Sequence, residues 1–146
     1  MPSPSEPRYV FVYGTLCRGE QRDINNLNPH PQYVGEACVS GTLYDLGSYP
    51  GILLGGQGNV RGEVYRISAE LERTLDEIEE VWPQQTGEYA KREVFVLMRA
   101  SGGDKRDDIS VSCLVYEIAG SRTRGKRLIE DGDWVTYRKL KVSKQG

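Results

Sequence analysis

A strand-to-loop junction near the N-terminus carries the first groups that could do chemistry. Residues 9–16 read Tyr-Val-Phe-Val-Tyr-Gly-Thr-Leu, an apolar run typical of a β-strand that is interrupted at Gly14. Because glycine lacks a Cβ, the backbone can turn there and direct the amides of Gly14, Thr15 and Leu16 into one pocket. Converging amides stabilise an anionic or carbonyl oxygen, so the junction predicts an oxyanion-binding loop for acyl transfer.

A predicted helix in the middle of the chain offers carboxylates that could act as bases. Ser68 is a favourable N-cap residue and Pro83 cannot continue a helix, so the pattern between them predicts a helix from Ala69 to about Val81. Its apolar stripe consists of Leu71, Leu75, Ile78 and Trp82. A carboxylate at the border of this stripe would be partly desolvated, which raises its pKa and makes it a better general base near neutral pH.

The helical angle ranks these carboxylates by their distance from the stripe. At about 100° per residue, with Leu71 as the origin, Glu79 lies at roughly 80° and Glu72 at roughly 100°. Asp76 lies near roughly 140° and Glu80 near roughly 180° by the same geometry. Glu79 is therefore the best-placed base, although position alone does not exclude Glu72. An acidic run on a helix is also typical of a solvated face without a catalytic role.

The whole chain, residues 1–146, is expected to form a single domain with a flexible N-terminal segment at 1–7. A net charge of -2 with both signs interspersed argues against nucleic acid or an anionic membrane as a partner, so a small-molecule substrate is expected. The chain has no basic start followed by an apolar stretch, and no apolar run reaches the roughly 18 residues of a membrane span. These features predict a soluble, cytoplasmic protein.

The cysteines are few and widely spaced. Cys17, Cys38 and Cys113 fit neither a disulfide framework nor a zinc site of the paired-cysteine kind, so reduced thiols and no metal are expected. A nucleophilic pair of Cys17 with His30, the only histidine, is an alternative, which the prolines flanking His30 and the lack of a third orienting group disfavour. Arg18 beside the loop could steer a carboxylate, although a solvated arginine is the simpler interpretation.

Short β-rich segments separated by glycine clusters predict a barrel or a sandwich. Glycine makes up 17 of the 146 residues, which is well above the usual share of about 7%. Besides the first strand, strands are predicted at 36–45, 60–67, 92–99 and 109–118, with both faces of 60–67 buried. Turns are predicted at 46–51, 55–58 and 101–108, one or two helical turns at 19–27, and a turn at 127–134 that returns Trp134 to the domain.

Six segments occur in the order found in the γ-glutamylcyclotransferase-like proteins, also called the AIG2-like family, which the chain resembles over nearly its whole length. They are Val10-Phe-Val-Tyr-Gly-Thr-Leu16, the 41–51 segment Gly-Thr-Leu-Tyr-Asp-Leu-Gly-Ser-Tyr-Pro-Gly, Gly62-Glu-Val-Tyr65, Leu75-Asp-Glu-Ile-Glu79, Tyr89-Ala-Lys-Arg-Glu-Val94 and Gly132-Asp-Trp134. Each segment alone is a weak signal, but six in register make the resemblance specific. It implies an α+β fold, a small closed mixed β-barrel flanked by short helices.

The resemblance also implies an activity and a set of site residues. The loop Tyr13, Gly14, Thr15 and Leu16 would hold a γ-glutamyl group through backbone amides, and Glu79 would be the general base. The α-amine of the γ-glutamyl group would attack its own γ-carbonyl and close 5-oxoproline, releasing an amine or an amino acid without a cofactor. The implied partner is a small-molecule γ-glutamyl substrate, and the protein is expected to be a monomer or a weak homodimer.

The chain departs from the family pattern beside the implied site. Glu80 follows the glutamate where relatives often have glycine, and the family's Tyr-x-Arg becomes Tyr89-Ala-Lys91 or, one residue on, Arg92. Because these positions are expected to face the substrate, the departures bear on substrate choice. Tyr89, like Tyr13, could line the pocket and bond the substrate, or could bury its ring with the hydroxyl at the rim. A non-catalytic module that only captures a small carboxylate or amine is the alternative function.

The first prediction tests the assignment of the base. Glu79→Gln should keep the fold and the affinity for ligand but abolish most turnover, because the amide cannot accept a proton. The matched control Glu80→Gln, on the far side of the predicted helix, should be nearly silent in the same steady-state assay. An active Glu79→Gln enzyme, together with an essential Glu80 or Glu72, would show that the base is misassigned.

Overall fold

The computed structural model describes residues 8–20, 22–47, 49–78, 89–98 and 109–145. The strands in this part are β1 (Arg8–Val12), β2 (Gln32–Asp45), β3 (Pro50–Ile67), β4 (Tyr89–Met98), β5 (Ile109–Ile118) and β6 (Arg127–Ile129). The α-helices are α1 (Ala69–Ile78) and α2 (Trp134–Gln145), and the 3-10 helices are η1 (Ile24–Asn26) and η3 (Gly120–Thr123). None of these helices is long and apolar enough to cross a membrane.

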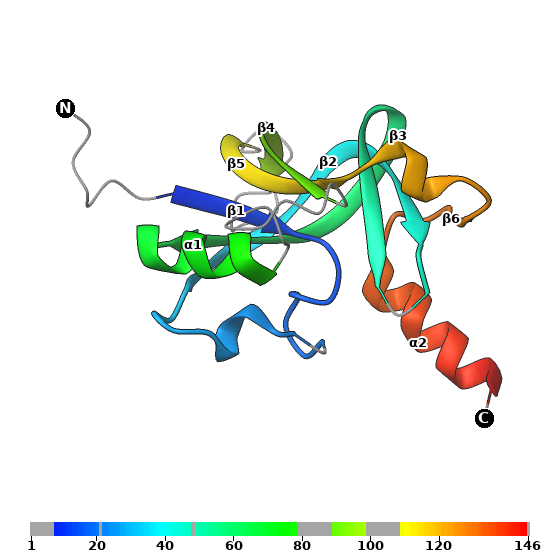
Figure 1. Cartoon of the computed structure of the whole chain (residues 1–146), viewed down its shortest axis with the longest axis horizontal. Helices are drawn as coiled ribbons and strands as arrows, with labels where there is room; N and C mark the ends of the chain where they lie inside the picture. The colour runs from blue at the N-terminus through cyan, green and yellow to red at the C-terminus, as the bar shows by residue number, and fades with distance from the viewer. Residues whose placement is uncertain (1–7, 21, 48, 79–88, 99–108, 146) are drawn as a thin grey trace.

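Five of the strands close into a mixed β-barrel, as the resemblance predicts. The strand order is β3-β1-β5-β4-β2-β6, and a further pairing of β2 with β3 joins the ends of the first five. β1 runs parallel to β5, whereas the other pairs are antiparallel. β6 pairs only with the far end of β2, outside the ring. Figure 1 shows α1 beside β1 and α2 at the other end of the molecule, near β6 and the extension of β2 and β3.

β1 lies in the middle of this arrangement and is buried on both faces. Phe11 belongs to the core inside the barrel, together with residues of every other barrel strand. Val10 and Val12, which point to the opposite face, belong to a second core with Leu71 and Leu75 of α1. An apolar run without alternation is typical of a strand with both faces covered, which explains the composition of this segment. The two cores fix the end of β1, where the loop begins.

The predicted strands are confirmed within the described residues, but the predicted turn at 55–58 is part of a longer strand pairing. The predicted turns at 46–51 and 127–134 also contain strand residues, the start of β3 and the whole of β6. The segment 55–58, expected to be a turn, lies within β3. On β2, Ser40 faces Asn59 whereas the next residue, Gly41, faces Leu54, so four residues bulge out of the ladder. Gly55 and Gly56 have φ of 93° and 84°, which explains why glycines occupy the bulge. The glycines therefore mark an irregularity inside a strand, where a break between strands was predicted.

The helices follow the predictions in part. The hydroxyl Oγ of Ser68 accepts from the amide of Leu71 at 3.1 Å, so the predicted N-cap of α1 is confirmed. The described part of α1 reaches Ile78, and the predicted remainder, with Trp82, lies outside the described residues, as do 1–7 and the turn at 101–108. At 19–27 the helical part is the single turn η1, with Ile24 fully buried.

α2 was not predicted, although the return of Trp134 to the core is confirmed. Trp134 is 3% exposed and joins the barrel core. The helix that begins there is capped by Asp133, whose carboxylate accepts from the amide of Thr136 at 3.2 Å. Its exposed face mixes polar residues with Leu140, which is 56% exposed, so the apolar period is weak. The N-cap residue Asp133 was the signal in the sequence that could have identified it.

The second prediction concerns two glycines in the left-handed region of backbone space. Gly132 and Gly125 have φ of 64° and 72°, but a Cβ at Gly132 would collide with the carbonyl oxygen of Asn59, whereas one at Gly125 would meet nothing within 4 Å. Gly125→Ala should therefore cost only the backbone strain, about 1 kcal/mol of unfolding free energy. Gly132→Ala should cost clearly more, because the hydrogen bond from the amide of Arg61 to its carbonyl at 2.8 Å would also be displaced. Urea denaturation measures both, and equal losses would contradict the prediction.

Candidate active site

A cavity opens where the loop leaves the barrel, at the end of β1. It encloses about 440 Å³ of free space, its mouth included. The described residues that line it are Phe11, Val12, Tyr13, Gly14, Thr15, Leu16, Arg22, Tyr49, Pro50, Tyr89 and Tyr116. All five residues predicted to bind substrate are among them, although Tyr89 is separated from the loop by more than seventy positions in the sequence. The predicted base, Glu79, lies outside the described residues.

The loop is held in shape by its own carbonyl groups. The carbonyls of Gly14, Thr15 and Leu16 accept from the amides of Cys17, Arg22 and Ile24, at 3.0, 2.8 and 2.9 Å. Within the described part of the chain, no acceptor faces the amides of Gly14, Thr15 and Leu16 themselves. Buried amides without a partner are costly unless a ligand oxygen or water meets them. The loop therefore has the donors that an oxyanion or carbonyl oxygen requires.

The two predicted tyrosines form walls of the cavity with their rings. The hydroxyl of Tyr13 donates to the carbonyl of Tyr116 at 2.8 Å and accepts from the amide of Ile52 at 3.4 Å. The hydroxyl of Tyr89 donates to the carbonyl of Pro50 at 2.9 Å. Both hydroxyl groups are thus engaged with backbone atoms across the cavity. These contacts favour a role for the two residues in shaping the pocket.

Gly14 is required by a close approach rather than by its backbone angle. It is not among the glycines with positive φ in the described residues. A Cβ at this position would lie 2.5 Å from Cγ and 2.8 Å from Cδ of Pro50, which is a wall of the cavity. Pro50 is buried and starts β3, so it cannot move away freely. A side chain at Gly14 would therefore push Pro50 and change the shape of the cavity.

The alternative base Glu72 is committed to ion pairs. Its carboxylate accepts from Nε of Arg8 at 3.0 Å and from Nζ of Lys91 at 2.7 Å. Burial alone would raise the pKa of Glu72, but the hydrogen bonds and charges of Lys91 and Arg8 outweigh it and hold this pKa below the ordinary value. A carboxylate that is ionised more readily and already paired is a weaker base. Glu72 is also absent from the described lining of the cavity.

Lys91 and Arg92 are absent from the described lining of the cavity, in contrast to the prediction that they face the substrate. Nζ of Lys91 also pairs with Asp76 at 2.9 Å, so this side chain is directed at α1. Arg92 pairs with Glu117 on β5 at 3.0 Å. Two acidic partners on α1 explain the position of Lys91, because a lysine between two carboxylates forms charge-assisted hydrogen bonds with both. The departure from Tyr-x-Arg thus affects how α1 is attached to the barrel.

Asp76 links the attachment of α1 to the cavity wall. Its Oδ1 accepts from the hydroxyl of Tyr116 at 2.7 Å, and the ring of Tyr116 lines the cavity. The same carboxylate pairs through Oδ2 with Lys91. The side chain of Asp76 is only 14% exposed, so these bonds are shielded from water. α1 is thereby fixed against the strand that forms the cavity wall, up to the last turn before the chain reaches Glu79.

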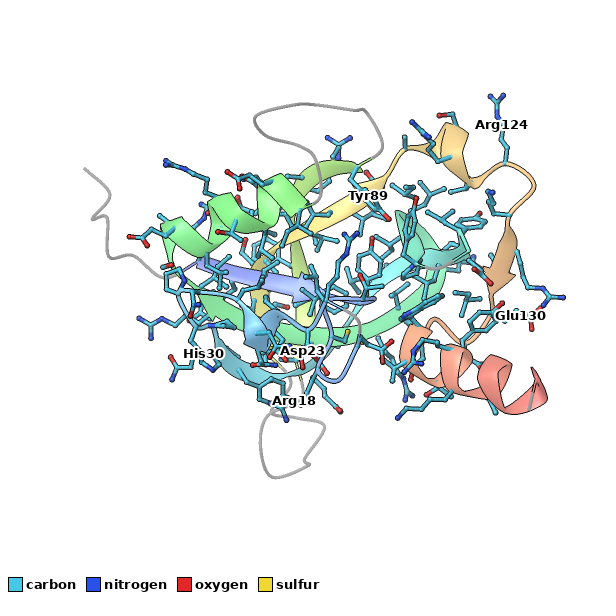
Figure 2. All side chains as sticks on the ribbon, turned by 60° about the horizontal axis from the view of Figure 1, so that its bottom comes forward. Arg18, Asp23, His30, Tyr89, Arg124 and Glu130 are labelled. Atoms are coloured by element: carbon cyan, nitrogen blue, oxygen red, sulfur yellow. The ribbon has the colours of Figure 1, made fainter. Side chains whose placement is uncertain are left out.

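The structure argues against the Cys17 and His30 alternative. Cys17 is 2% exposed, its Sγ donates to the carbonyl of Val12 at 3.5 Å, and burial raises the pKa of its thiol far above the ordinary value. His30 is exposed, and Figure 2 shows it well away from Tyr89 at the cavity. A buried thiol whose pKa is raised is a poor nucleophile. Cys17, Cys38 and Cys113 are all free thiols, as expected.

Arg22 is a cavity residue that sequence reasoning missed in favour of Arg18. The guanidinium of Arg18 lies 4.5 Å from the centre of the Tyr33 ring, and Arg18 is not among the lining residues. Arg22 is brought to the cavity by the hydrogen bond from its amide to Thr15. Its side chain is exposed, and no ion-pair partner for it occurs among the described residues. The sequence gives no signal that this loop folds back on itself, so Arg22 could not be predicted as a cavity residue.

The surroundings of this cavity match a known family. Residues 10–136 include Arg22, Tyr89 and the loop 13–16, here called the cradle, and they match the family model described as "Gamma-glutamyl cyclotransferase, AIG2-like". The chain belongs to this family. The resemblance noted in the sequence is thus confirmed, and membership supports γ-glutamylcyclotransferase-type enzymatic activity in general terms.

Individual relatives agree with this membership. The γ-glutamylcyclotransferase family protein YtfP of Escherichia coli K12 is 34% identical over 86% of this chain and 95% of its own length. The γ-L-glutamyl-butirosin B γ-glutamyl cyclotransferase of Niallia circulans is 40% identical, but the match spans only 49% of this chain and 45% of that protein. The crystal structure of an AIG2-like protein from Mus musculus superposes with a TM-score of 0.67, at 28% identity, over 86% of this chain and 87% of that one.

The third prediction concerns the glycine of the cradle. Gly14→Ala should reduce the rise in melting temperature that a γ-glutamyl ligand produces, because the new Cβ clashes with Pro50 and changes the shape of the cavity. Gly120→Ala is the matched control, since a Cβ there meets nothing within 4 Å and its φ lies outside the left-handed region. Thermal denaturation with and without ligand measures both variants. A Gly14→Ala protein with the full ligand-induced rise would contradict a role for this close approach.

Proposed function

We propose that the protein is a γ-glutamylcyclotransferase that converts a γ-glutamyl amine or γ-glutamyl amino acid into 5-oxoproline and the free amine. The single observation that carries the proposal is the cradle at the end of β1. Its amides at Gly14, Thr15 and Leu16 donate to no described acceptor, and the three residues line the same cavity as Tyr89 and Arg22. The Niallia circulans relative is named for a γ-L-glutamyl compound, which supports the same substrate class.

The proposed reaction is an intramolecular aminolysis. The α-nitrogen of the γ-glutamyl group forms a bond to its own γ-carbonyl carbon, and the bond from that carbon to the leaving nitrogen breaks. A proton removed from the α-ammonium frees the attacking lone pair, and a second proton passes from the attacking nitrogen to the leaving nitrogen. Because the nucleophile and the electrophile share one molecule, the protein has to fold the glutamyl chain, move these protons and stabilise the oxyanion.

In this proposal the cradle amides bind the γ-carbonyl oxygen as its negative charge develops. Loss of one such donor typically costs about 10²- to 10³-fold in turnover. The rings of Tyr13, Tyr89 and Tyr116 would enclose the glutamyl methylene groups, since all three line the cavity. Enclosure of the glutamyl group by these rings would favour the folded conformation in which its α-amine reaches its γ-carbonyl.

Glu79 is proposed as the group that moves the protons. The motif Leu75-Asp-Glu-Ile-Glu79 and the helical angle support this assignment. A further support is that Ile78, the last residue of α1 and the neighbour of Glu79 in the sequence, lines a groove together with Arg22. Arg22 also lines the cavity, so the described end of α1 is close to it. A pure binder of glutamyl anions would gain nothing from a carboxylate here.

The direct test is to incubate the protein with γ-glutamyl-lysine, γ-glutamyl dipeptides and glutathione and to measure 5-oxoproline. Release of 5-oxoproline from at least one conjugate, lost in Glu79→Gln, is expected. Ligand-induced stabilisation without any 5-oxoproline would contradict the proposal and favour the non-catalytic binding module.

The fourth prediction concerns the pH dependence of kcat/KM. Because the base must be ionised, the rate should fall on the acid side with an apparent pKa above the roughly 4.3 of a hydrated glutamate, as partial desolvation predicts. Glu79→Asp should keep this acid limb but lower the plateau, because the shorter side chain misplaces the carboxylate by about one methylene. An unchanged acid limb in a still-active Glu79→Gln enzyme would show that another group titrates.

A further inference from the structure

A second depression adjoins the cavity and shares one residue with it. This groove encloses about 780 Å³ of free space, its mouth included, and its described lining is Arg22, Asp23, Asn26, Leu27 and Ile78. Arg22 is the residue common to both linings. Since the amide of Arg22 donates to the carbonyl of Thr15, the arginine stands directly beside the cradle. The groove therefore lies beside the cradle, on the side of Arg22.

The lining of the groove combines an apolar wall with charge. Leu27 and Ile78 are half-buried and supply apolar surface from the loop after η1 and from the end of α1. Arg22 supplies an exposed guanidinium without an ion-pair partner among the described residues. A planar guanidinium of this kind is suited to a carboxylate, which it can bind through two parallel hydrogen bonds.

Asp23 adds a fixed negative charge to the same groove. Its carboxylate accepts from the amides of Gly19 and Asn25 at 2.8 and 2.9 Å, and from Nδ2 of Asn25 at 2.9 Å. Although burial opposes it, these hydrogen bonds and the charge of Arg18 keep the pKa of Asp23 below the ordinary value. Figure 2 shows Asp23 on the segment that folds back below β1. A cation and an anion at one groove suit a free amino acid, which carries both charges when it is released.

From this arrangement we infer that the groove is the subsite for the leaving group, and that it favours an amino acid with an apolar side chain over an amine without a carboxylate. The inference rests on the proposed function. The carboxylate of the leaving amino acid pairs with Arg22, and its side chain lies against Leu27 and Ile78. Arg22 acts here as a specificity residue for the part of the substrate that departs.

The test compares two conjugates that differ only in this carboxylate: γ-glutamyl-leucine and the γ-glutamyl amide of 3-methylbutylamine. Wild-type protein should show a higher kcat/KM for the leucine conjugate, mainly through KM. In Arg22→Gln the ratio of the two kcat/KM values should fall by about 10- to 100-fold, the range expected for a lost charge-assisted hydrogen bond. Arg22→Lys should restore part of the ratio, because it keeps the charge but not the planar fork.

Two controls separate this role from others. Arg66→Gln removes an exposed arginine of β3 that lines neither the groove nor the cavity, and should leave the ratio unchanged. Leu27→Ala should lower kcat/KM for γ-glutamyl-leucine relative to γ-glutamyl-glycine severalfold, because it removes part of the apolar wall. Arg22→Gln should also bind 5-oxoproline, measured by calorimetry, as the wild type does, since that product lacks the leaving group.

The outcomes that overturn the inference are distinct from failure of the proposed function. If wild-type protein releases 5-oxoproline from both conjugates with equal kcat/KM, the carboxylate subsite is wrong while the activity stands. The same holds if Arg22→Gln lowers both values equally or loses affinity for 5-oxoproline, because Arg22 would then bind the glutamyl part. If neither these conjugates nor the wider panel yields 5-oxoproline, the proposed function is wrong, and the subsite with it.

Discussion

The arrangement depends on one strand that has to be buried on both faces. β1 pairs with β3 on one side and with β5 on the other, so its backbone is held at both edges. Phe11 fills the barrel while Val10 and Val12 pack toward α1, so neither face is free to turn. A strand constrained in this way places its C-terminal end with little freedom. The loop that follows is therefore also held in a fixed position, together with its amides at Gly14, Thr15 and Leu16. A preorganised oxyanion site requires donors fixed in this way.

The polar contacts outside the barrel extend the same constraint to α1. Lys91 lies between two carboxylates of this helix, Glu72 and Asp76, and Tyr116 donates to Asp76 from the cavity wall. These groups are largely shielded from water, so each has to find its partner to avoid the cost of burial. The pairing therefore specifies one position of α1 against β4 and β5. The cavity wall and the end of the helix are set by the same few bonds.

The loop that forms the cradle also connects the cavity to its surroundings. Hydrogen bonds from the backbone of Arg22 and Ile24 to Thr15 and Leu16 fold the loop back on itself, which brings a cation beside the amides. The guanidinium of Arg22, at the junction of the cavity and the groove, places a positive charge at the site. The net charge of the whole chain is -2, so it does not indicate a positive charge at this site. Charge at the site is decided by placement rather than by composition.

The sequence by itself determined much of the fold and part of the site. Uninterrupted apolar residues predicted β1, period-two alternation predicted the other barrel strands, and Ser68 predicted the start of α1, because these signals are local. Six short segments in register identified the family and the cradle. The glycines at 55–58 led to the wrong prediction of a turn between strands. Glycine is common both in turns and in β-bulges, and here the partner strand continues past the bulge.

Only the tertiary structure decided which side chains meet. Tyr89 reaches Pro50, Lys91 turns to Glu72 and Asp76, and Arg22 lies beside Thr15, although nothing in the spacing of these residues indicates it. The order in which strands pair sets such contacts, because it brings together segments that lie far apart in the chain. Burial likewise made Cys17 inert, since the environment of a thiol is a property of packing and not of neighbouring residues in the sequence. Sequence patterns determined the helices and strands, and the closing of the barrel determined which side chains meet and in what environment.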